Sequence, residues 1–332
     1  MKGLEKVIER KGKRFLFKVE TSDYPKDYLK YEELREEIWG FPDDNLPGMR
    51  NMMCKNFLHD GSSLFIAVFA ETEKGDFSKQ DRAHLVGFSY GFVGVKDKEV
   101  AFRTLDNIQF YSQYVGVRQD FQNFGLGILI KEFQREKLMD LLGIYTSTCS
   151  YDPLTGVNAC RNIHHLGMEV IDYRVDIYGE FGGYLNRADI PSDRFIMSWD
   201  LKKEPQRPAY GLESVLERKQ IVTKVDHAEI KGKSGLLELE IIQDVNLDLE
   251  HGFLLVEIPL DFYKMLRETD VDDKKTREIP LEWRMRTRQV FQNLFQRGYK
   301  IIDFRQIGRN SRQRNFYILK KINSSEEEYH EI

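Results

Sequence analysis

The sequence has few cysteines and no long apolar run. Cys54, Cys149 and Cys160 are odd in number and share no Cys-x-x-Cys spacing, so we expect reduced thiols and no disulfide framework. No apolar stretch approaches the roughly 20 residues that cross a bilayer. The N-terminus also lacks the apolar core of a signal peptide. We therefore expect a cytoplasmic protein with no membrane partner.

The chain also lacks an excess of either charge. Its 50 basic and 54 acidic residues give a formal net charge of −4, which gives no reason to expect nucleic acid or an anionic membrane as a partner. Its length of 332 residues, of which 12% are aromatic, allows two domains with a sizeable core. This composition agrees with a cytosolic enzyme.

A glycine turn between an expected strand and an expected helix carries the clearest chemistry. The apolar run 114–117 precedes the turn 122–127 (QNFGLG), and a helical pattern begins at Ile128. Gly125 and Gly127 let the backbone turn sharply and approach a ligand, because neither has a Cβ atom. The amides at such a helix start have no intrahelical partner and favour an anion. The turn therefore predicts a site for a phosphate or pyrophosphate.

The spacing of the turn narrows the class of cofactor. A Walker loop is excluded because no Gly-Lys-Ser/Thr follows, and Ile130 stands where a dinucleotide fingerprint needs a third small residue. What remains is Gln122-x-x-Gly125-x-Gly127 after a strand, preceded by Arg118. This pattern resembles motif A of the GCN5-related N-acetyltransferase (GNAT) superfamily, in which the turn holds the pyrophosphate of acetyl-CoA.

A second motif follows in the order that the superfamily shows. The run 144–150 predicts a strand, Asp152-Pro153 ends it, and Asn158 opens a short helix that closes at Gly167. From about residue 31 to 319 the chain resembles a bacterial and archaeal branch of uncharacterised predicted acetyltransferases with an extra C-terminal region. Some members of this or a neighbouring branch are associated with N-succinylamino-acid metabolism. The narrower resemblance rests on Tyr151-Asp152-Pro153-Leu154, Leu166-Gly167, Tyr178-Gly179, Pro191-Ser192-Asp193-Arg194, Trp199-Asp200-Leu201, residues 253–259, Trp283-Arg284, Thr287-Arg288 and Gly298-Tyr299.

The resemblance implies an α/β (α+β) fold with a mixed, mostly antiparallel sheet flanked by helices, and a second, smaller α+β domain. We expect a GNAT domain at 1–201, a linker at 202–211, an α+β domain at 212–321 that covers the acceptor site, and a disordered acidic tail at 322–332. The hydrophobic patterns predict strands at 14–20, 63–71, 85–95, 110–117, 169–178, 236–242, 252–258, 301–305 and 315–320, and helices at 28–39, 52–58, 260–268 and 281–297.

The resemblance also implies the cofactor and its contacts. The cofactor is acetyl-CoA or another short-chain acyl-CoA, without a metal. Arg118 either reaches a phosphate or caps the turn, and Asn158 either contacts the pantetheine arm or caps its helix. The backbone of 114–117 supplies the oxyanion donor. The implied cofactor-binding residues are Val115, Val117, Arg118, Gln122, Asn123, Phe124, Gly125, Leu126, Gly127 and Asn158.

The usual general acid of the superfamily is missing, because Ile163 occupies the position of its tyrosine. The candidates that replace it are Ser150, Tyr151 and Asp152 at the end of a strand. Alternatively, the CoA thiolate leaves without a proton donor, since a thiol is a fairly good leaving group. Strict alternation along 110–117 places Tyr111, Gln113 and Val115 on one face, and Ser112 and Tyr114 on the other. The candidate substrate-binding residues are Tyr111, Gln113, Asp152 and Arg194.

Other charged residues allow more than one interpretation. Arg284, Arg286 and Arg288 could bind an acidic acceptor or a succinyl carboxylate, although steps of two on a helix bring at most two of them together. His164 and His165 are expected at the surface, because adjacent helical side chains diverge.

The predicted activity is acyl-CoA-dependent N-acyl transfer by direct attack of a small-molecule amine or amino acid. A non-catalytic CoA-binding module and an acyltransferase that modifies a protein partner are the alternatives. The sequence leaves the acyl chain and the oligomeric state open, a homodimer included. Replacement of Gly125 by Glu is expected to abolish CoA binding and to leave the fold intact.

Overall fold

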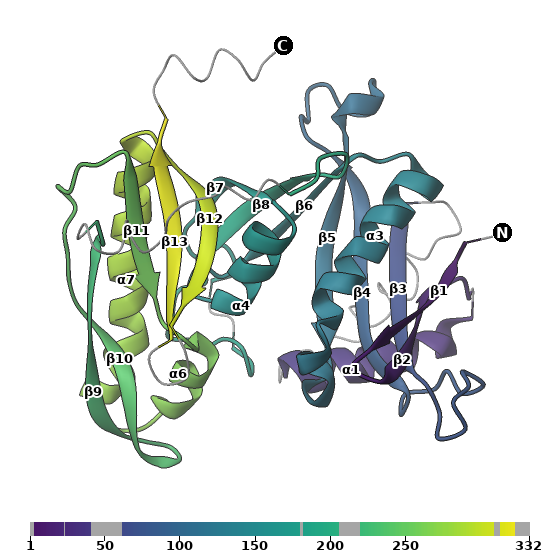
Figure 1. Ribbon diagram of the computed structural model, residues 1–332, viewed down its shortest axis with the longest axis horizontal. Helices are drawn as coiled ribbons and strands as arrows, with labels where there is room; N and C mark the ends of the chain where they lie inside the picture. Colours follow the sequence, from purple (N-terminus) through teal and green to yellow (C-terminus); the bar gives the residue numbers. More distant parts are fainter. Residues whose placement is uncertain are drawn as a thin grey trace. The chain divides into compact units, whose positions relative to one another are not determined.

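The computed structural model describes residues 3–22, 24–40, 62–179, 182–205, 220–308 and 313–322. The expected helix at 52–58, much of the expected linker and nearly all of the expected acidic tail lie outside these ranges. The chain divides into two compact units (Figure 1), of which the first comprises Met1–Cys149 and Ser198–Lys203, and the second comprises Ser150–Met197 and Glu204–Ile332. No helix in the described ranges is long and apolar enough to cross a membrane.

These units differ from the expected division at residue 201. Residues 150–197, which the sequence assigns to the GNAT domain, pack in the second unit with the C-terminal part of the chain. The physical reason is a set of buried polar contacts that join segments far apart in sequence. Asp152 pairs with Arg284, and the Tyr151 hydroxyl lies 3.2 Å from that of Tyr317.

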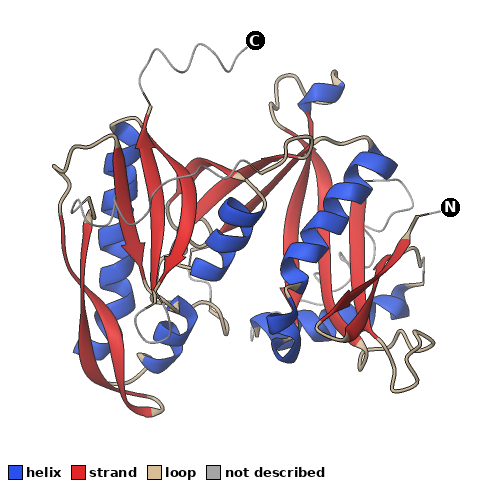
Figure 2. Ribbon diagram, in the orientation of Figure 1, coloured by secondary structure: helices blue, strands red, loops and turns tan. Residues whose placement is uncertain are grey.

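The main sheet is mixed and mostly antiparallel, as the resemblance implies (Figure 2). Its strand order is β1-β2-β3-β4-β5-β6-β8-β7. The strands from β1 to β5 pair antiparallel, whereas β5 and β6 are parallel. The bounds are β1 Glu5–Arg10, β2 Lys13–Val19, β3 Ser63–Ala70, β4 Leu85–Val95, β5 Ile108–Val117, β6 Thr146–Tyr151, β7 Glu169–Arg174 and β8 Arg194–Asp200. Strand β1 was not predicted, because its side chains are mostly exposed and carry no alternation.

Two helices cover opposite faces of the sheet in the first unit. Helix α1 (Leu29–Trp39) lies on the face that carries Phe88 and Tyr90, and its Tyr31 ring packs on Phe65 with 4.4 Å between centroids. Helix α3 (Leu126–Leu142) lies on the other face, where Phe133 meets Phe17 at 5.9 Å between ring centroids. The two faces follow from the alternation of side chains along a strand. The predicted helix at 28–39 and the helix expected after the glycine turn are thus confirmed.

The second unit contains a three-stranded sheet, a long hairpin and the helices α4, α6 and α7. The sheet order is β11-β13-β12, and the hairpin pairs β9 with β10. Asp273 begins α7 earlier than predicted, because its carboxylate accepts a hydrogen bond from the Thr276 amide at 2.9 Å. Strand β9 was not predicted, since charged residues interrupt its apolar positions. The bounds are β9 Thr223–Gly232, β10 Gly235–Val245, β11 Phe253–Ile258, β12 Tyr299–Ile307, β13 Arg314–Lys321, α4 Gly156–Ala159, α6 Phe262–Glu268 and α7 Lys274–Gln296.

An aromatic core holds this unit together. Phe195 of β8 packs edge-on against Phe291 of α7, with 4.9 Å between ring centroids, and against Tyr317 of β13 at 5.6 Å. Phe291 and Tyr317 meet each other at 5.4 Å. Edge-to-face pairs of this kind are favoured by the ring quadrupoles. The core fixes the positions of β8, α7 and β13, which carry most of the polar residues described below.

Candidate active site

Strand β5 carries one extra residue at Gln113. Tyr90 of β4 pairs with Tyr114, whereas the next residue, Gly91, pairs with Ser112. Gln113 therefore has no partner of its own, which makes it a β-bulge, and a bulge bends the strand and increases its twist. The predicted strand 110–117 is confirmed, but its regular alternation is not.

The bulge corrects the expected distribution of side chains along β5. Ser112 points toward α3, where its hydroxyl accepts a hydrogen bond from the Lys131 ammonium at 2.7 Å. Tyr114 points toward α1, where its ring packs on Trp39 at 5.5 Å between centroids. Ser112 and Tyr114 were predicted to share a face and lie on opposite faces instead. The extra residue at Gln113 is the physical reason, because it reverses the phase of the alternation.

The pairing of β5 with β6 is short. It joins Phe110 to Ser147 and Tyr111 to Thr148, and residues 112–117 extend beyond it. The bulge lies directly after the last pair, where a bend turns the strand away from a parallel neighbour. Val115 and Val117, predicted as cofactor contacts, lie on this extension and are half-buried. The extension leads into the glycine turn.

The glycine turn has the geometry that its sequence predicts. A short 3-10 helix, Gln119–Phe124, ends at Gly125, which has φ +70° and ψ 18°. This left-handed conformation favours glycine. Helix α3 starts at the next residue, and the amides of Ile128 and Leu129 bond to the Gly125 carbonyl at 3.2 and 3.4 Å. The amides that precede them belong to the first turn of a helix and have no intrahelical acceptor.

The side chains of the turn mostly serve to hold it in place. Phe124 packs on Phe15 with 5.4 Å between centroids, and Leu126 is fully buried. The Gln122 amide donates to the Val117 carbonyl at 3.4 Å, and the Lys11 ammonium donates to the Asn123 carbonyl at 2.6 Å. The backbone of the turn, more than its side chains, is thus the part that can meet a ligand.

The guanidinium of Arg118 is bound by residues close to it in the fold. Its guanidinium donates to both carboxylate oxygens of Asp120, at 2.8 and 3.1 Å, and to the Ala83 carbonyl at 2.9 Å. The bond to Arg118 lowers the pKa of Asp120. Of the two roles predicted for Arg118, bracing of the turn is the one that these contacts provide.

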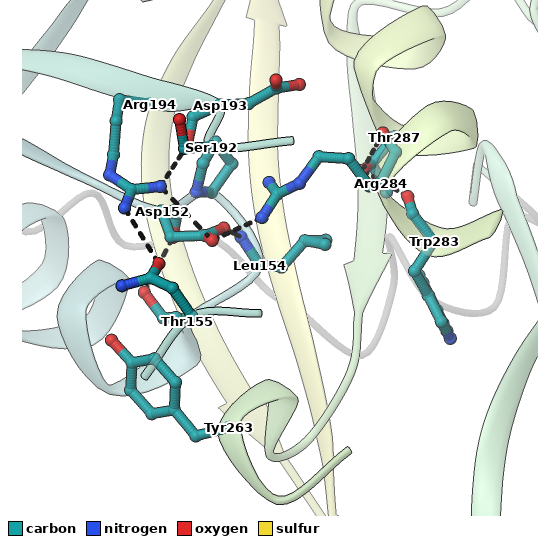
Figure 3. A network of polar contacts seen from close by, with 12 residues as sticks. Asp152, Leu154, Thr155, Ser192, Asp193, Arg194, Tyr263, Trp283, Arg284 and Thr287 are labelled. Atoms are coloured by element: carbon teal, nitrogen blue, oxygen red, sulfur yellow. Dashed lines mark hydrogen bonds and ion pairs between the residues drawn. The ribbon is translucent and has the colours of Figure 1, made fainter. Parts of the chain in front are cut away.

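Asp152 lies inside a network of buried charges in the second unit (Figure 3). One carboxylate oxygen contacts the guanidinium of Arg284 and lies 3.5 Å from that of Arg194. The other accepts from the Leu154 amide at 2.9 Å. Asp152 is only 7% exposed, and the two arginines neutralise its charge. A base must reach the proton that it removes, so this arrangement favours a structural role for Asp152.

A second buried acid, Asp193, stands beside this pair. Its carboxylate receives two hydrogen bonds from Arg288, at 2.8 and 2.7 Å, and one from the Tyr173 hydroxyl at 2.6 Å. Burial and then the charge of Asp193 raise the pKa of Tyr173. Arg288, which the sequence left open as an acceptor ligand, is thus used to neutralise Asp193.

The other two residues predicted at the end of β6 differ in their surroundings. Tyr151 is buried, and its hydroxyl lies 3.2 Å from the Tyr317 hydroxyl, which donates to the Pro153 carbonyl at 2.7 Å. The Ser150 hydroxyl lies 3.2 Å from the hydroxyl of Tyr178, a residue that is 46% exposed. Of the three candidates, Ser150 is the one with an accessible hydroxyl partner.

Asn158 is engaged within the second unit. Its amide donates to the Thr155 hydroxyl at 3.0 Å and to the Tyr263 hydroxyl at 3.3 Å, and its oxygen accepts from Arg161 at 2.9 Å. Thr155 is the N-cap of α4, and no side-chain hydrogen bond caps that helix, so these contacts hold the Asn158 side chain in the fold without capping the helix. Ile163, which replaces the superfamily tyrosine, is buried.

The remaining predicted residues lie apart from this network. Tyr111 packs on Phe92 with 5.5 Å between centroids, and Gln113 is exposed in the bulge. His164 was expected at the surface but is half-buried, because it lies 2.9 Å from the buried Asp303 carboxylate. In the ranges that the structure describes, no cluster of three or more His, Cys, Asp or Glu side chains could hold a metal ion.

Sequence reasoning missed the partners of Asp152 and the hydroxyl of Tyr178. The periodicity of α7 could have indicated the partner Arg284, because this residue lies on the same helical face as the buried Thr287, Phe291 and Leu294. A buried arginine requires a carboxylate partner. The sequence analysis noted Tyr178 only as part of the resemblance and gave it no role; it follows β7 in an irregular segment.

No family model matches the chain, and no curated protein sequence matches it. Solved structures to which the chain is similar include the ribosomal-protein-S18-alanine N-acetyltransferase of Escherichia coli, with 14% identity, a TM-score of 0.38, and coverage of 58% of this chain and 99% of the other. NAA60 of Arabidopsis thaliana in complex with acetyl-CoA has 13% identity, a TM-score of 0.41, and coverage of 57% and 99%. A mutant of spermidine N-acetyltransferase SpeG from Vibrio cholerae has 13% identity, a TM-score of 0.37, and coverage of 57% and 95%.

The expected architecture is present in the elements described above. A mixed, mostly antiparallel sheet leads through β5 to a glycine turn and α3, then to the parallel strand β6 and a short helix. The order of these elements and the position of the turn agree with the fold that the sequence resemblance implies.

Proposed function

We propose that this protein is an acyl-CoA-dependent N-acyltransferase of the cytoplasm, which transfers an acetyl group or a larger acyl group such as succinyl to an amine. The observation that carries the proposal is the left-handed Gly125 between the bulged strand β5 and the start of α3. The acceptor that we propose is a small-molecule amine or amino acid.

The turn would bind the pyrophosphate of CoA through backbone amides at the positive end of the α3 dipole. The extension of β5 at 112–117 would lie alongside the pantetheine arm of the cofactor. A backbone amide of 114–117 would donate a hydrogen bond to the thioester oxygen. Such a donor stabilises the negative charge that develops on that oxygen as the amine attacks. In this assignment the backbone supplies the binding energy, which agrees with the side-chain contacts of Phe124 and Leu126 inside the fold.

Transfer would be direct, without an acyl-enzyme. Cys149 is buried, and burial, followed by the charge of Asp303, raises the pKa of the Cys160 thiol. A thiol with a raised pKa holds little thiolate near neutral pH and is a poor nucleophile. In this proposal the attacking group is the amine of the acceptor, which needs only correct placement and loss of a proton.

The first experiment is calorimetry with CoA, acetyl-CoA and succinyl-CoA on the wild-type protein. We expect binding in the micromolar range, about −8 kcal/mol, and the preferred acyl group then selects the amines to test for transfer. Binding of none of the three would overturn the proposal. Binding of acyl-CoA without transfer to any amine would instead support the non-catalytic alternative.

A matched pair of variants tests the turn itself. Because Gly125 has φ +70°, a Glu side chain would be strained there, whereas Asn and Asp enter this conformation more readily. Gly125→Asp and Gly125→Asn have the same shape and differ by one negative charge. A carboxylate at about 5 Å from a pyrophosphate charge costs about 3 kcal/mol at an effective dielectric of about 20. We expect the Asp variant to bind CoA at least about 100-fold more weakly than the Asn variant; equal affinities would place the phosphates elsewhere.

A further inference from the structure

The turn between β1 and β2 places a lysine in an uncommon backbone conformation. The two strands (Figure 1) pair as far as Arg10 and Lys13, which leaves Lys11 and Gly12 as a two-residue turn. Both residues have positive φ values, +50° and +74°, as in a type I′ turn. Asn, Asp or Gly is favoured at the first of these positions, and a long side chain is uncommon there. The lysine therefore has a use that the hairpin alone does not explain.

The lysines of this hairpin lie beside the glycine turn that precedes α3. The Lys11 ammonium donates to the Asn123 carbonyl at 2.6 Å. The Lys13 ammonium lies 5.6 Å from the ring centroid of Phe124. A Cβ atom added to Gly125 would have no atom within 4 Å, so the space beside the glycine turn is open. Two ammonium groups thus border a turn that is open to a ligand.

Aromatic packing holds the hairpin against the glycine turn. Phe15 of β2 is fully buried and packs edge-on against Phe121 and Phe124, with 6.1 and 5.4 Å between ring centroids. Phe15 lies two residues after Lys13, and side chains two apart in a strand share a face. The Lys13 side chain is therefore directed toward the glycine turn. All of these residues belong to the first unit.

The two lysines bring an excess of positive charge to the glycine turn. Among the residues that the structure describes, neither ammonium forms an ion pair with a carboxylate. The neighbouring Asp120 binds Arg118. The bond to Arg118 lowers the pKa of Asp120, and the charge of Lys13 adds to this effect. Lys11, Lys13 and Arg118 together outweigh Asp120, in a chain whose formal net charge is −4.

We propose that Lys11 and Lys13 bind the phosphate monoester on the ribose of CoA, and so make the site prefer CoA to a cofactor that lacks this group. This inference rests on the function proposed above. The backbone amides of the glycine turn would bind the pyrophosphate. A phosphate monoester carries a charge of about −1.5 to −2 near neutral pH, and an ammonium binds such a group as a point charge. The two lysines supply these point charges beside the open side of the turn.

A second role is open to Lys11, because its ammonium also holds the Asn123 carbonyl. A residue that only braces the turn would support every ligand of the turn alike. A contact with the monoester would support only ligands that carry the monoester. Dephospho-CoA keeps the pyrophosphate and lacks the monoester, so it separates the two roles.

The test is calorimetry with CoA and dephospho-CoA on the full chain at low salt. The lysine variants are Lys13→Met and Lys11→Asn, of which the second removes the ammonium and introduces a residue that type I′ turns favour. The control is Lys98→Met, since Lys98 is exposed in the loop between β4 and β5, at the other end of β5 from the glycine turn. Urea unfolding of each variant shows whether the fold is retained.

We expect the wild type to bind CoA about 100-fold more tightly than dephospho-CoA, and each lysine variant to lower this ratio by about 10-fold. The affinity for dephospho-CoA should stay close to that of the wild type. The ratio should also shrink as salt is added. Lys98→Met should match the wild type, and Lys11→Asn should be at least as stable as the wild type because it relieves the uncommon conformation of the lysine.

A failure of this inference differs from a failure of the proposed function. Equal binding of CoA and dephospho-CoA by the wild type, or a ratio that the lysine variants leave unchanged, refutes the monoester contact and leaves the pyrophosphate site in place. A wild-type protein that binds neither ligand refutes the proposed cofactor, and this inference with it.

Discussion

Replacement of Asp152 by Asn is expected to cost the second unit more stability than replacement of its partner Arg284 by Met. The carbonyl oxygen of the new side chain could still accept from the Leu154 amide, as one carboxylate oxygen does now at 2.9 Å. Its NH₂ group would, however, face the guanidinium of Arg284 and that of Arg194, which are donors only. Two buried cations would therefore lose their shared anion.

The magnitudes follow from what each change leaves unpaired. Arg284 is 1% exposed, and its Nε and Nη1 atoms have no hydrogen-bond partner among the described residues. Without Asp152 it would be a buried charge with no acceptor, which costs about 3–5 kcal/mol. Arg284→Met removes that charge and the two unpartnered donors, each of which costs about 1–3 kcal/mol when buried. Asp152 would keep Arg194 and Leu154, so we expect a loss below about 2 kcal/mol.

Hydrogen exchange of α7 peptides measures this difference in the second unit alone. A gap of about 2 kcal/mol corresponds to roughly 30-fold faster exchange in Asp152→Asn than in Arg284→Met. Far-UV circular dichroism on each variant serves as the control for the overall fold. If the two variants exchange equally, or if Arg284→Met exchanges faster, the reasoning from unpaired buried charge is refuted.

Two further changes test the first unit. Asp120→Asn removes the anion that holds Arg118, so CoA affinity should rise severalfold at low salt and the gain should shrink as salt is added. The bond to Arg118 lowers the pKa of Asp120, so the ion pair between these residues is complete above about pH 4 and is lost only as the pH falls through the lowered value. The gain in CoA affinity should therefore be the same at pH 6 and at pH 8. A gain that differs between these two pH values would contradict the pairing. Gly116→Ala places a Cβ 2.6 Å from the Trp39 ring and should lower the free energy of unfolding in urea by about 1–3 kcal/mol. The control Gly94→Ala, whose Cβ would have no atom within 4 Å, should lower it clearly less. Equal losses of stability in the two variants would argue against the clash.

The parts of this protein that sequence predicts best are those set by local periodicity. Strand β5, the glycine turn and helix α3 follow from an apolar run, Gly125 and a helical pattern, all within a short stretch. The bulge at Gln113 escaped prediction because alternation within one strand cannot show which partner residues oppose it. It becomes visible only through pairing with β4.

Long-range pairing limited the prediction of the site. Asp152 and Arg284 were both noticed in the sequence, each with a separate role at the substrate. Their contact joins residues 132 positions apart, and no local pattern encodes such a separation. The assignment of 150–197 to the first domain was limited by the same cause, since the buried contacts of this segment are made with the C-terminal part of the chain.

The π-helical turn Cys160–His165 affects how this segment is aligned with other proteins. The Leu166 amide bonds to the Arg161 carbonyl, five residues back, at 3.1 Å. Such a turn holds one residue more than an α-helical turn, so it corresponds to a single-residue insertion. An ungapped alignment with an α-helical relative would be out of register by one position beyond it.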